Sequence, residues 1–235
     1  MNTILKIILY SFFSGITIIL GGLLSRFLRI KNKAINEEII HWAIAFGGGV
    51  LIAAVAFALI PKGVKELSLF WLITVFLSGT FTFFFIDRQI SRKGGSLAQL
   101  MAMLMDFLPE ALALGASFAH DHRFGLLLAL FIGLQNFPEG FNAYRELVKR
   151  YTPKRSLLLM LLLSFTGVFA ALIGVLLLSN SPKLIAAVML FAGGGIIYIM
   201  FQDIAPLSKR KGDWIPASGA SIGFLIGMIG EKLLL

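Results

Sequence analysis

The sequence contains no cysteine and only three histidines, and its 12 acidic residues are outnumbered by 21 basic ones. The absence of cysteine excludes disulfide bonds and thiolate metal sites. Charged residues make up 14% of the chain, against about 25% in a typical soluble domain. Apolar residues are abundant instead, because 58% of the 235 residues are hydrophobic and the mean hydropathy is +0.89. These values predict an integral membrane protein with a single transmembrane domain over residues 1–235.

The apolar residues fall into eight runs, and each run has the length of about 20 residues that a helix needs to cross a bilayer. The first run precedes its basic cluster, which is the reverse of a signal peptide, so we expect a retained helix. The expected fold is all-α, a polytopic membrane protein with eight transmembrane helices. They are predicted over residues 3–25, 39–61, 67–87, 97–119, 124–145, 156–179, 182–206 and 214–234.

Most of the 21 Lys and Arg residues fall in the connections that follow the first, third, fifth and seventh runs. The positive-inside rule places these connections in the cytoplasm. The chain is therefore expected to be a multi-pass protein of the cell (plasma) membrane with both termini outside. This topology accounts for the net charge of +9, and no nucleic-acid partner is expected.

Spans two and seven share a pattern of glycine and proline. Span two contains glycines 47–49, the last of them 12 residues before Pro61, and span seven contains glycines 193–195, the last of them 11 residues before Pro206. Because the two spans cross the membrane in opposite directions, the pattern indicates an inverted repeat of helices 1–3 and 6–8 around helices 4 and 5, a 3+2+3 arrangement. Glycine triplets also serve simply to let helices approach closely, so both interpretations remain open.

Spans four and five each carry a Pro-Glu pair in the middle of an apolar run. Span four reads Asp-Phe-Leu-Pro-Glu over residues 106–110, and span five reads Gln-Asn-Phe-Pro-Glu-Gly over residues 135–140. A carboxylate in hydrocarbon costs about 2.5–3.5 kcal/mol on insertion scales, and proline removes a helix hydrogen bond. Two such pairs in the same pattern indicate a polar site inside the membrane.

Helical spacing places Asp106 and Glu110 on one face of span four. The same spacing places Gln135, Asn136 and Glu139 on one face of span five. Three carboxylates close together need a cation or protons between them, and oxygen ligands suit Mg, Mn and Fe(II), whereas zinc more often takes His and Cys. These five residues are therefore predicted to bind a metal ion. The alternative is a role in interhelical hydrogen bonds, and this alternative is strongest for Gln135 and Asn136.

Two further polar residues lie near the cytoplasmic end of span seven. Gln202 and Asp203 come just before Pro206. They are candidates for lining an exit path, and the alternative is that they lie at the membrane interface.

At residues 135–140 the chain resembles the ZIP (zinc- and iron-regulated transporter-like) family of metal-ion transporters. That family carries a His-Asn-x-Pro-Glu-Gly type of motif on its fourth helix and a related motif on its fifth. Eight spans, external termini and the 3+2+3 plan are also similar to the family. The resemblance implies that Glu110, Gln135 and Glu139 occupy metal-site positions and that Asp106 replaces a histidine. Asn136 matches a position that helps to form a second, adjacent metal site in relatives.

The chain also departs from the family pattern. Phe107 stands where the family usually has asparagine, and Gly167-Val168 stand in span six where the family carries Glu-Pro. Ala58 replaces a frequent histidine of span two. We therefore expect the second metal position to be lost or altered, which leaves one oxygen-rich site on helices 4 and 5.

Residues and resemblance together predict a transporter of divalent metal cations of the zinc, iron or manganese class, moving ions toward the cytoplasm. The metal is then cargo, and neither a cofactor nor enzymatic activity is expected. The expected partners are metal ions, the lipid bilayer and, by resemblance, a second copy in a homodimer. An intramembrane carboxylate-dependent hydrolase and a non-transporting metal-binding relative are the alternatives.

Overall fold

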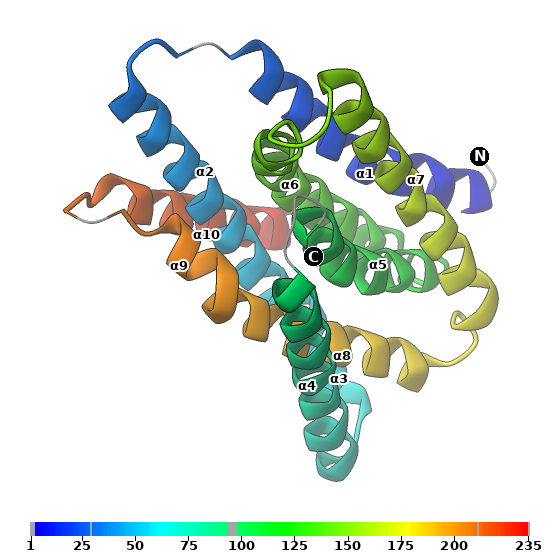
Figure 1. Ribbon diagram of the computed structural model, residues 1–235. Coiled ribbons are helices and arrows are strands. Elements are labelled where there is room, and N and C mark those ends of the chain that lie inside the picture. Colours follow the sequence, from blue (N-terminus) through cyan, green and yellow to red (C-terminus); the bar gives the residue numbers. More distant parts are fainter. Residues whose placement is uncertain (1–2, 29, 94–97, 211, 235) are drawn as a thin grey trace.

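The computed structural model describes residues 3–28, 30–93, 98–210 and 212–234, and helices make up most of them (Figure 1). Within these ranges there is no β-strand, and eight helical stretches are long and apolar enough to cross a membrane. The expected all-α, eight-span fold is confirmed. The elements are α1 (Thr3–Phe27), α2 (Lys33–Ala54), η1 (Val55–Leu59), α3 (Ile60–Glu66), α4 (Leu69–Lys93), α5 (Ala98–Phe118), α6 (His122–Leu147), α7 (Pro153–Leu177), α8 (Pro182–Ile199), η2 (Met200–Ile204), α9 (Ala205–Ser208) and α10 (Ile215–Leu234).

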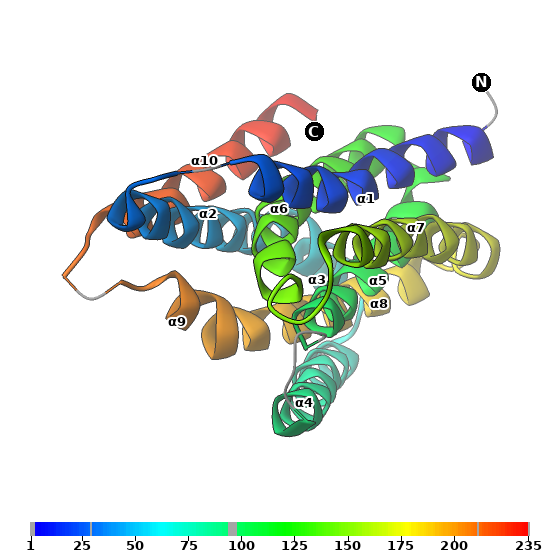
Figure 2. The ribbon, with the colours of Figure 1, turned by 45° about the horizontal axis from the view of Figure 1, so that its top comes forward.

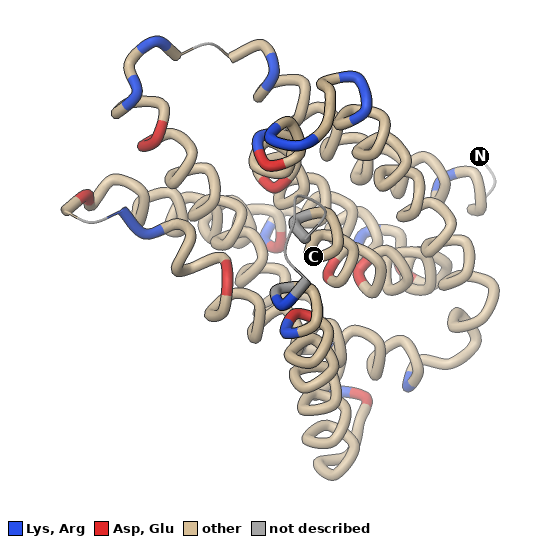
Figure 3. Tube along the Cα trace, in the orientation of Figure 1, with Lys and Arg blue, Asp and Glu red and all other residues tan. Residues whose placement is uncertain are grey.

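Charge is concentrated at the ends of the long helices. Figure 3 shows Lys and Arg mainly at helix ends and connections, while most of each helix carries neither acidic nor basic residues. A few acidic positions interrupt the uncharged central part of the bundle, and α5 and α6 supply three of them. The charge distribution therefore fits a membrane-spanning bundle with carboxylates in its interior.

Spans two and seven extend past the prolines at which we predicted them to end. Span two continues beyond Pro61 to Glu66, and span seven continues beyond Pro206 to Ser208. Span two also begins before residue 39, because the side chain of Asn32 caps α2 by accepting hydrogen bonds from two backbone N–H groups.

A π-helical turn precedes each of these prolines. The N–H of Ile60 donates to the carbonyl of Val55, five residues back, and the N–H of Ala205 donates to the carbonyl of Met200 in the same way. Proline has no N–H and clashes with the carbonyl of the turn before it. A π-turn inserts one extra residue into that turn, so it changes which carbonyl faces the proline ring. The helix can therefore continue past the proline instead of ending there.

The packing of the helices repeats itself between the two halves of the chain. In the first half α1 packs against α6 and α2 packs against α10; in the second half α7 packs against α5 and α8 packs against α4. Figures 1 and 2 show α6 near the middle of the bundle, and the two groups of spans also contact each other directly, for example through α2 and α10. If α1, α2 and α4 are exchanged with α7, α8 and α10, and α5 with α6, the contact of α1 with α6 becomes that of α7 with α5. In the same way the contact of α2 with α10 becomes that of α8 with α4. This is the pattern that an inverted 3+2+3 repeat predicts.

The glycine triplets also bring helices into close contact. A Cβ atom on Gly49 would lie 2.0 Å from the carbonyl oxygen of Ala220 in α10, and one on Gly194 would lie 2.2 Å from the carbonyl oxygen of Phe76 in α4. The two triplets therefore make equivalent contacts with the last span of each half. Close approach and repeat were alternative interpretations of this pattern, and the structure agrees with both.

Replacing Gly140 by alanine should destabilise the contact between α1 and α6. The added Cβ would lie 2.1 Å from the carbonyl oxygen of Ile18, so the backbones must separate, at a cost of about 1–3 kcal/mol. Thermal unfolding of the purified protein in detergent measures the loss. Gly133→Ala on the same helix is the matched control, because its Cβ meets nothing closer than 3.6 Å. Equal melting temperatures for the two variants would contradict the packing described here.

Candidate metal site

The central helices α5 and α6 are neighbours in the chain and pack against each other. The short connection ends at Asp121, whose side chain caps α6 by accepting from the backbone N–H groups of Arg123 and Phe124 at 2.9 and 3.0 Å. Both helices continue through their internal prolines, Pro109 and Pro138. The two Pro-Glu pairs therefore lie on adjacent helices that run in opposite directions.

Four of the five predicted site residues are buried. The exposed fraction is 4% for Asp106, 2% for Glu110 and 0% for Gln135 and Asn136. The side-chain amide of Gln135 donates a hydrogen bond to the Glu110 carboxylate, which joins α6 to α5. A carboxylate oxygen of Asp106 accepts from the backbone N–H of Phe107 at 2.8 Å.

Acceptor oxygens on α6 are buried without a hydrogen-bond donor. Within the described part of the chain, no donor reaches Gln135 Oε1, Asn136 Oδ1 or Glu139 Oε2, and the same holds for Asn142 Oδ1 one turn further along. The amide nitrogen of Asn136 is engaged, since it donates to the carbonyl of Ser14 at 3.3 Å. Buried polar atoms are rarely left unsatisfied. Oxygens that accept nothing from the protein are suited to a cation, so the donor chemistry of this cluster fits a hard or borderline divalent metal.

Asp106 and Glu139 line a cavity of about 200 Å³, and Glu110 and Gln135 are not among its lining residues. Asp203 of η2, a candidate for lining an exit path, lines the same cavity. Gln202 does not line it and is exposed. Asp106 and Glu139 thus face a common space, whereas Glu110 does not line it and accepts the hydrogen bond from Gln135.

Asp87 is a further carboxylate of this cavity, and the sequence analysis did not single it out. It lies in α4 and accepts a hydrogen bond from the hydroxyl of Tyr198 at 2.9 Å. The signal was present in the sequence, because Asp87 lies within an apolar stretch that continues to Ile90. Ending the third span at residue 87 made it look like an ordinary interfacial charge.

Carboxylates alone do not complete a metal site in this structure. Among the described residues, no three His, Cys, Asp or Glu side chains are grouped closely enough to hold a metal ion. The three histidines make contacts elsewhere. His41 Nδ1 lies 2.8 Å from the Leu207 carbonyl oxygen, His120 Nε2 contacts the carbonyl oxygen of Ser179, and the His122 ring packs against Phe118. A metal held here would need the amide oxygens of α6 in addition to the carboxylates.

Comparison with known proteins relates the chain to metal transporters. It is 35% identical to zinc transporter GufA of Myxococcus xanthus over 147 residues, which are 61% of this chain and 58% of GufA. It is 26% identical to the putative zinc transporter At3g08650 of Arabidopsis thaliana over 175 residues, or 67% of this chain and 28% of that protein. Zinc transporter zipt-7.1 of Caenorhabditis briggsae is 29% identical over 126 residues, or 52% of this chain and 32% of that protein. The chain is thus similar to three proteins that are named zinc transporters.

The similarity to these proteins has limits. The chain spans less than two thirds of the length of each of these relatives, and no family model matches it. The divergence agrees with the incomplete motif of span four, where Asp106 and Phe107 replace the histidine and asparagine of the ZIP pattern.

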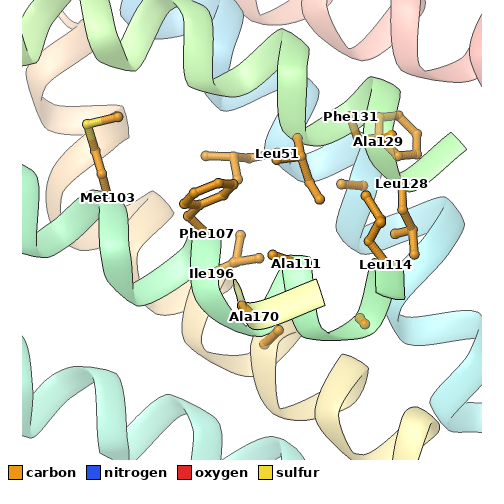
Figure 4. Close-up of a cluster of buried hydrophobic side chains, with 14 of the residues drawn as sticks. Leu51, Met103, Phe107, Ala111, Leu114, Leu128, Ala129, Phe131, Ala170 and Ile196 are labelled. Carbon is orange, nitrogen blue, oxygen red and sulfur yellow. The ribbon is translucent and has the colours of Figure 1, made fainter. Parts of the chain in front are cut away.

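Two departures from the ZIP pattern contact each other in space. Phe107 of α5 is fully buried, and Figure 4 shows it among apolar side chains of the core that include Leu51 and Ile196. A Cβ on Gly167 of α7 would lie 2.2 Å from the Phe107 ring, and one on Gly15 of α1 would lie 3.3 Å from it. The Phe107 ring therefore occupies the space that a side chain at position 167 would need.

Proposed function

We propose that the chain is a transmembrane transporter of divalent metal cations. The observation that carries this proposal is the group of buried acceptor oxygens on α6, at Gln135, Asn136 and Glu139, for which the described residues provide no donor. The carboxylates of Asp106 and Glu110 lie buried on the adjacent helix. The names of the similar proteins, all of them zinc transporters, support the same function.

The proposed metal site consists of Asp106, Glu110, Gln135, Asn136 and Glu139. All five supply oxygen, and neither histidine nor cysteine takes part. Oxygen donors favour manganese or iron(II) over softer metals, although zinc also accepts carboxylates. The proposed cargo is therefore an ion of the zinc, iron or manganese class. Within this class the oxygen donors of the site favour the harder ions, manganese and iron(II).

The proposed path leads from this site to the basic face of the bundle, through the cavity lined by Asp106, Glu139, Asp87 and Asp203. A smaller cavity of about 60 Å³ shares Glu139 with it and is also lined by Asn142. The positive-inside rule assigns the basic face to the cytoplasm, so ions would move inward. Movement of the outer spans against α5 and α6 would open the opposite side.

Two alternatives make different predictions. A non-transporting relative would bind metal and show no flux. An intramembrane hydrolase would use paired carboxylates as acid and base, and the similar proteins, all named as transporters, argue against it. A homodimer remains part of the proposal, and the exposed apolar side chains of α4 offer one surface for it.

Purified protein in vesicles that contain a metal-sensitive dye tests the function. Vesicles with the protein should take up Mn, Fe(II) or Zn faster than empty vesicles, and each metal is offered separately. The order of rates gives the metal class. Metal binding to the protein without uptake above the empty vesicles would favour the non-transporting alternative and overturn the proposal.

Asp203→Asn should slow uptake roughly tenfold, because outer partners of a metal site typically contribute 10–100-fold. The substitution keeps the size of the side chain and removes its charge from the exit cavity. Gln202→Ala is the matched control, since the neighbouring side chain is exposed and does not line that cavity. Equal rates for Asp203→Asn and wild type would place the path elsewhere.

A further inference from the structure

A second, much larger cavity lies on the other side of α6. It is a groove of about 730 Å³ along α1, α2 and α6, and its lining includes Phe13, Leu24, Ile39, Trp42, Leu130 and Phe141. Figures 1 and 2 show these three helices next to one another. Two of the three hydroxyls in the lining are already used within α1, because Ser14 donates to the Ser11 carbonyl and Thr17 to the Ser14 carbonyl. The third hydroxyl is that of Tyr10. The lining of the groove is thus predominantly apolar.

The size and position of the groove suit a hydrocarbon chain. Ligand pockets typically have about 300–1,000 Å³, and this groove runs between membrane spans from Phe13, in the first half of α1, to Phe141, near the end of α6. Each methylene that leaves water contributes about 0.8 kcal/mol, but a lipid chain is already in hydrocarbon. Apolar fit alone therefore gives no preference for one lipid over another, and selectivity must come from the polar end of the groove.

A cation without an acidic partner lies at that end. Arg145 follows Phe141 by one turn of α6, and its guanidinium lies 5.5 Å from the centre of the Phe141 ring. It donates a hydrogen bond of 3.3 Å to the side chain of Asn36, which belongs to the first turn of α2. The ion pairs of the described residues do not include Arg145. The nearby carboxylates Glu37 and Glu146 are instead paired with other cations.

Further positive charge surrounds the same end of the groove. Arg26, in the last turn of α1, and Lys33, at the start of α2, are both exposed, and neither appears in an ion pair of the described residues. Arg26 lies two residues after Leu24, and Lys33 lies six before Ile39, and both of these apolar residues line the groove. Basic side chains without an ion-pair partner among the described residues thus lie at the end of the apolar groove.

We propose that this groove binds an anionic phospholipid, with an acyl chain along α6 and the phosphate at Arg145. A guanidinium forms paired hydrogen bonds with a phosphate, and basic pockets between membrane helices are typical sites for anionic head groups. The acyl chain of the lipid would lie against Phe137 and Pro138, which directly precede Glu139. The proposal does not depend on metal transport, because it concerns the opposite side of α6.

Quenching of tryptophan fluorescence tests this proposal. Trp42 lines the groove, and the other two tryptophans, Trp71 and Trp214, are exposed and can be replaced by phenylalanine. The protein is placed in phosphatidylcholine vesicles with increasing fractions of phosphatidylglycerol or phosphatidylcholine that carry bromine on the acyl chain. Brominated phosphatidylglycerol should quench Trp42 at a roughly tenfold lower fraction than brominated phosphatidylcholine, the factor expected of one charge-assisted hydrogen bond.

Substitutions of Arg145 and of a residue that lines the groove distinguish binding at this site from non-specific contact with lipid. Arg145→Gln should abolish the preference for phosphatidylglycerol, Arg145→Lys should retain most of it, and Arg155→Gln, a control on α7, should leave it unchanged. Gly133→Leu should fill the groove and weaken quenching by both lipids. Equal quenching by the two lipids, or an unchanged preference in Arg145→Gln, would overturn the proposal. So would absence of quenching together with a crosslinked dimer through the groove, because a second copy would then be the occupant.

Discussion

Replacing Glu110 and Glu139 together by alanine should lower metal uptake into vesicles by more than about 100-fold. Loss of an outer partner of a metal site already costs 10–100-fold, and this change removes two proposed ligands from two helices. The change also removes the acceptor of the Gln135 hydrogen bond that joins α5 to α6. Both the metal affinity and the geometry of the site should therefore suffer. Uptake of the best wild-type metal, measured with a dye inside the vesicles, gives the result.

Glu146→Ala is the matched control for this experiment. Glu146 is an exposed carboxylate on the same helix and is paired with Lys149 at 2.7 Å. Exposed ion pairs contribute at most about 1 kcal/mol, so uptake should stay close to wild type. If the double variant also transported at the wild-type rate, the assignment of the metal site to α5 and α6 would be wrong.

Gly167→Glu should prevent the protein from folding, and Phe107→Asn should restore folding when the two are combined. A side chain at Gly167 meets the Phe107 ring, because even its Cβ would lie 2.2 Å from that ring. Removing the ring opens space for the new carboxylate. The combined variant should bind two metal ions per chain, whereas the wild-type chain should bind one.

The four proteins, namely wild type, each single variant and the combination, form a complete cycle. Folded yield by size-exclusion chromatography and bound metal by elemental analysis are measured for each. Phe107→Asn alone should be folded but less stable, since truncating a buried phenylalanine to alanine costs about 3–5 kcal/mol. Additive loss of folded yield in the combination would show that the two positions are independent, contrary to their contact.

The sequence was sufficient to predict the eight spans and the central place of the two Pro-Glu pairs. Apolar runs of about 20 residues have few other structural solutions, and helical spacing assigns residues to faces over short distances. The prediction was wrong where a span is irregular. Pro61 and Pro206 look like helix ends, because nothing in the sequence reveals the π-turns Val55–Leu59 and Met200–Ile204 that carry the helix past them.

The same irregularity explains why Asp203 lines the cavity of about 200 Å³ and its neighbour Gln202 does not. Adjacent residues on an α-helix point about 100° apart, and a π-turn shifts that phase. Sequence position alone could not separate Asp203, which lines the cavity, from Gln202, which is exposed. Asp87 was missed for a different reason, because the third span was predicted to end at this residue although the apolar stretch continues to Ile90.

The two halves of the chain pack in the same way but differ in one carboxylate. Asp203 lies three residues before Pro206, and the residue three before Pro61 is Ala58, which is fully buried. The backbone framework is thus nearly the same in both halves, while a carboxylate is present at this position in only one. An ion leaving towards the basic face would find an oxygen to replace part of its water shell, and an ion at the equivalent point of the other half would not. Concentration gradients still decide the net direction of flow, but the two membrane faces should differ in how readily they exchange an ion with the site.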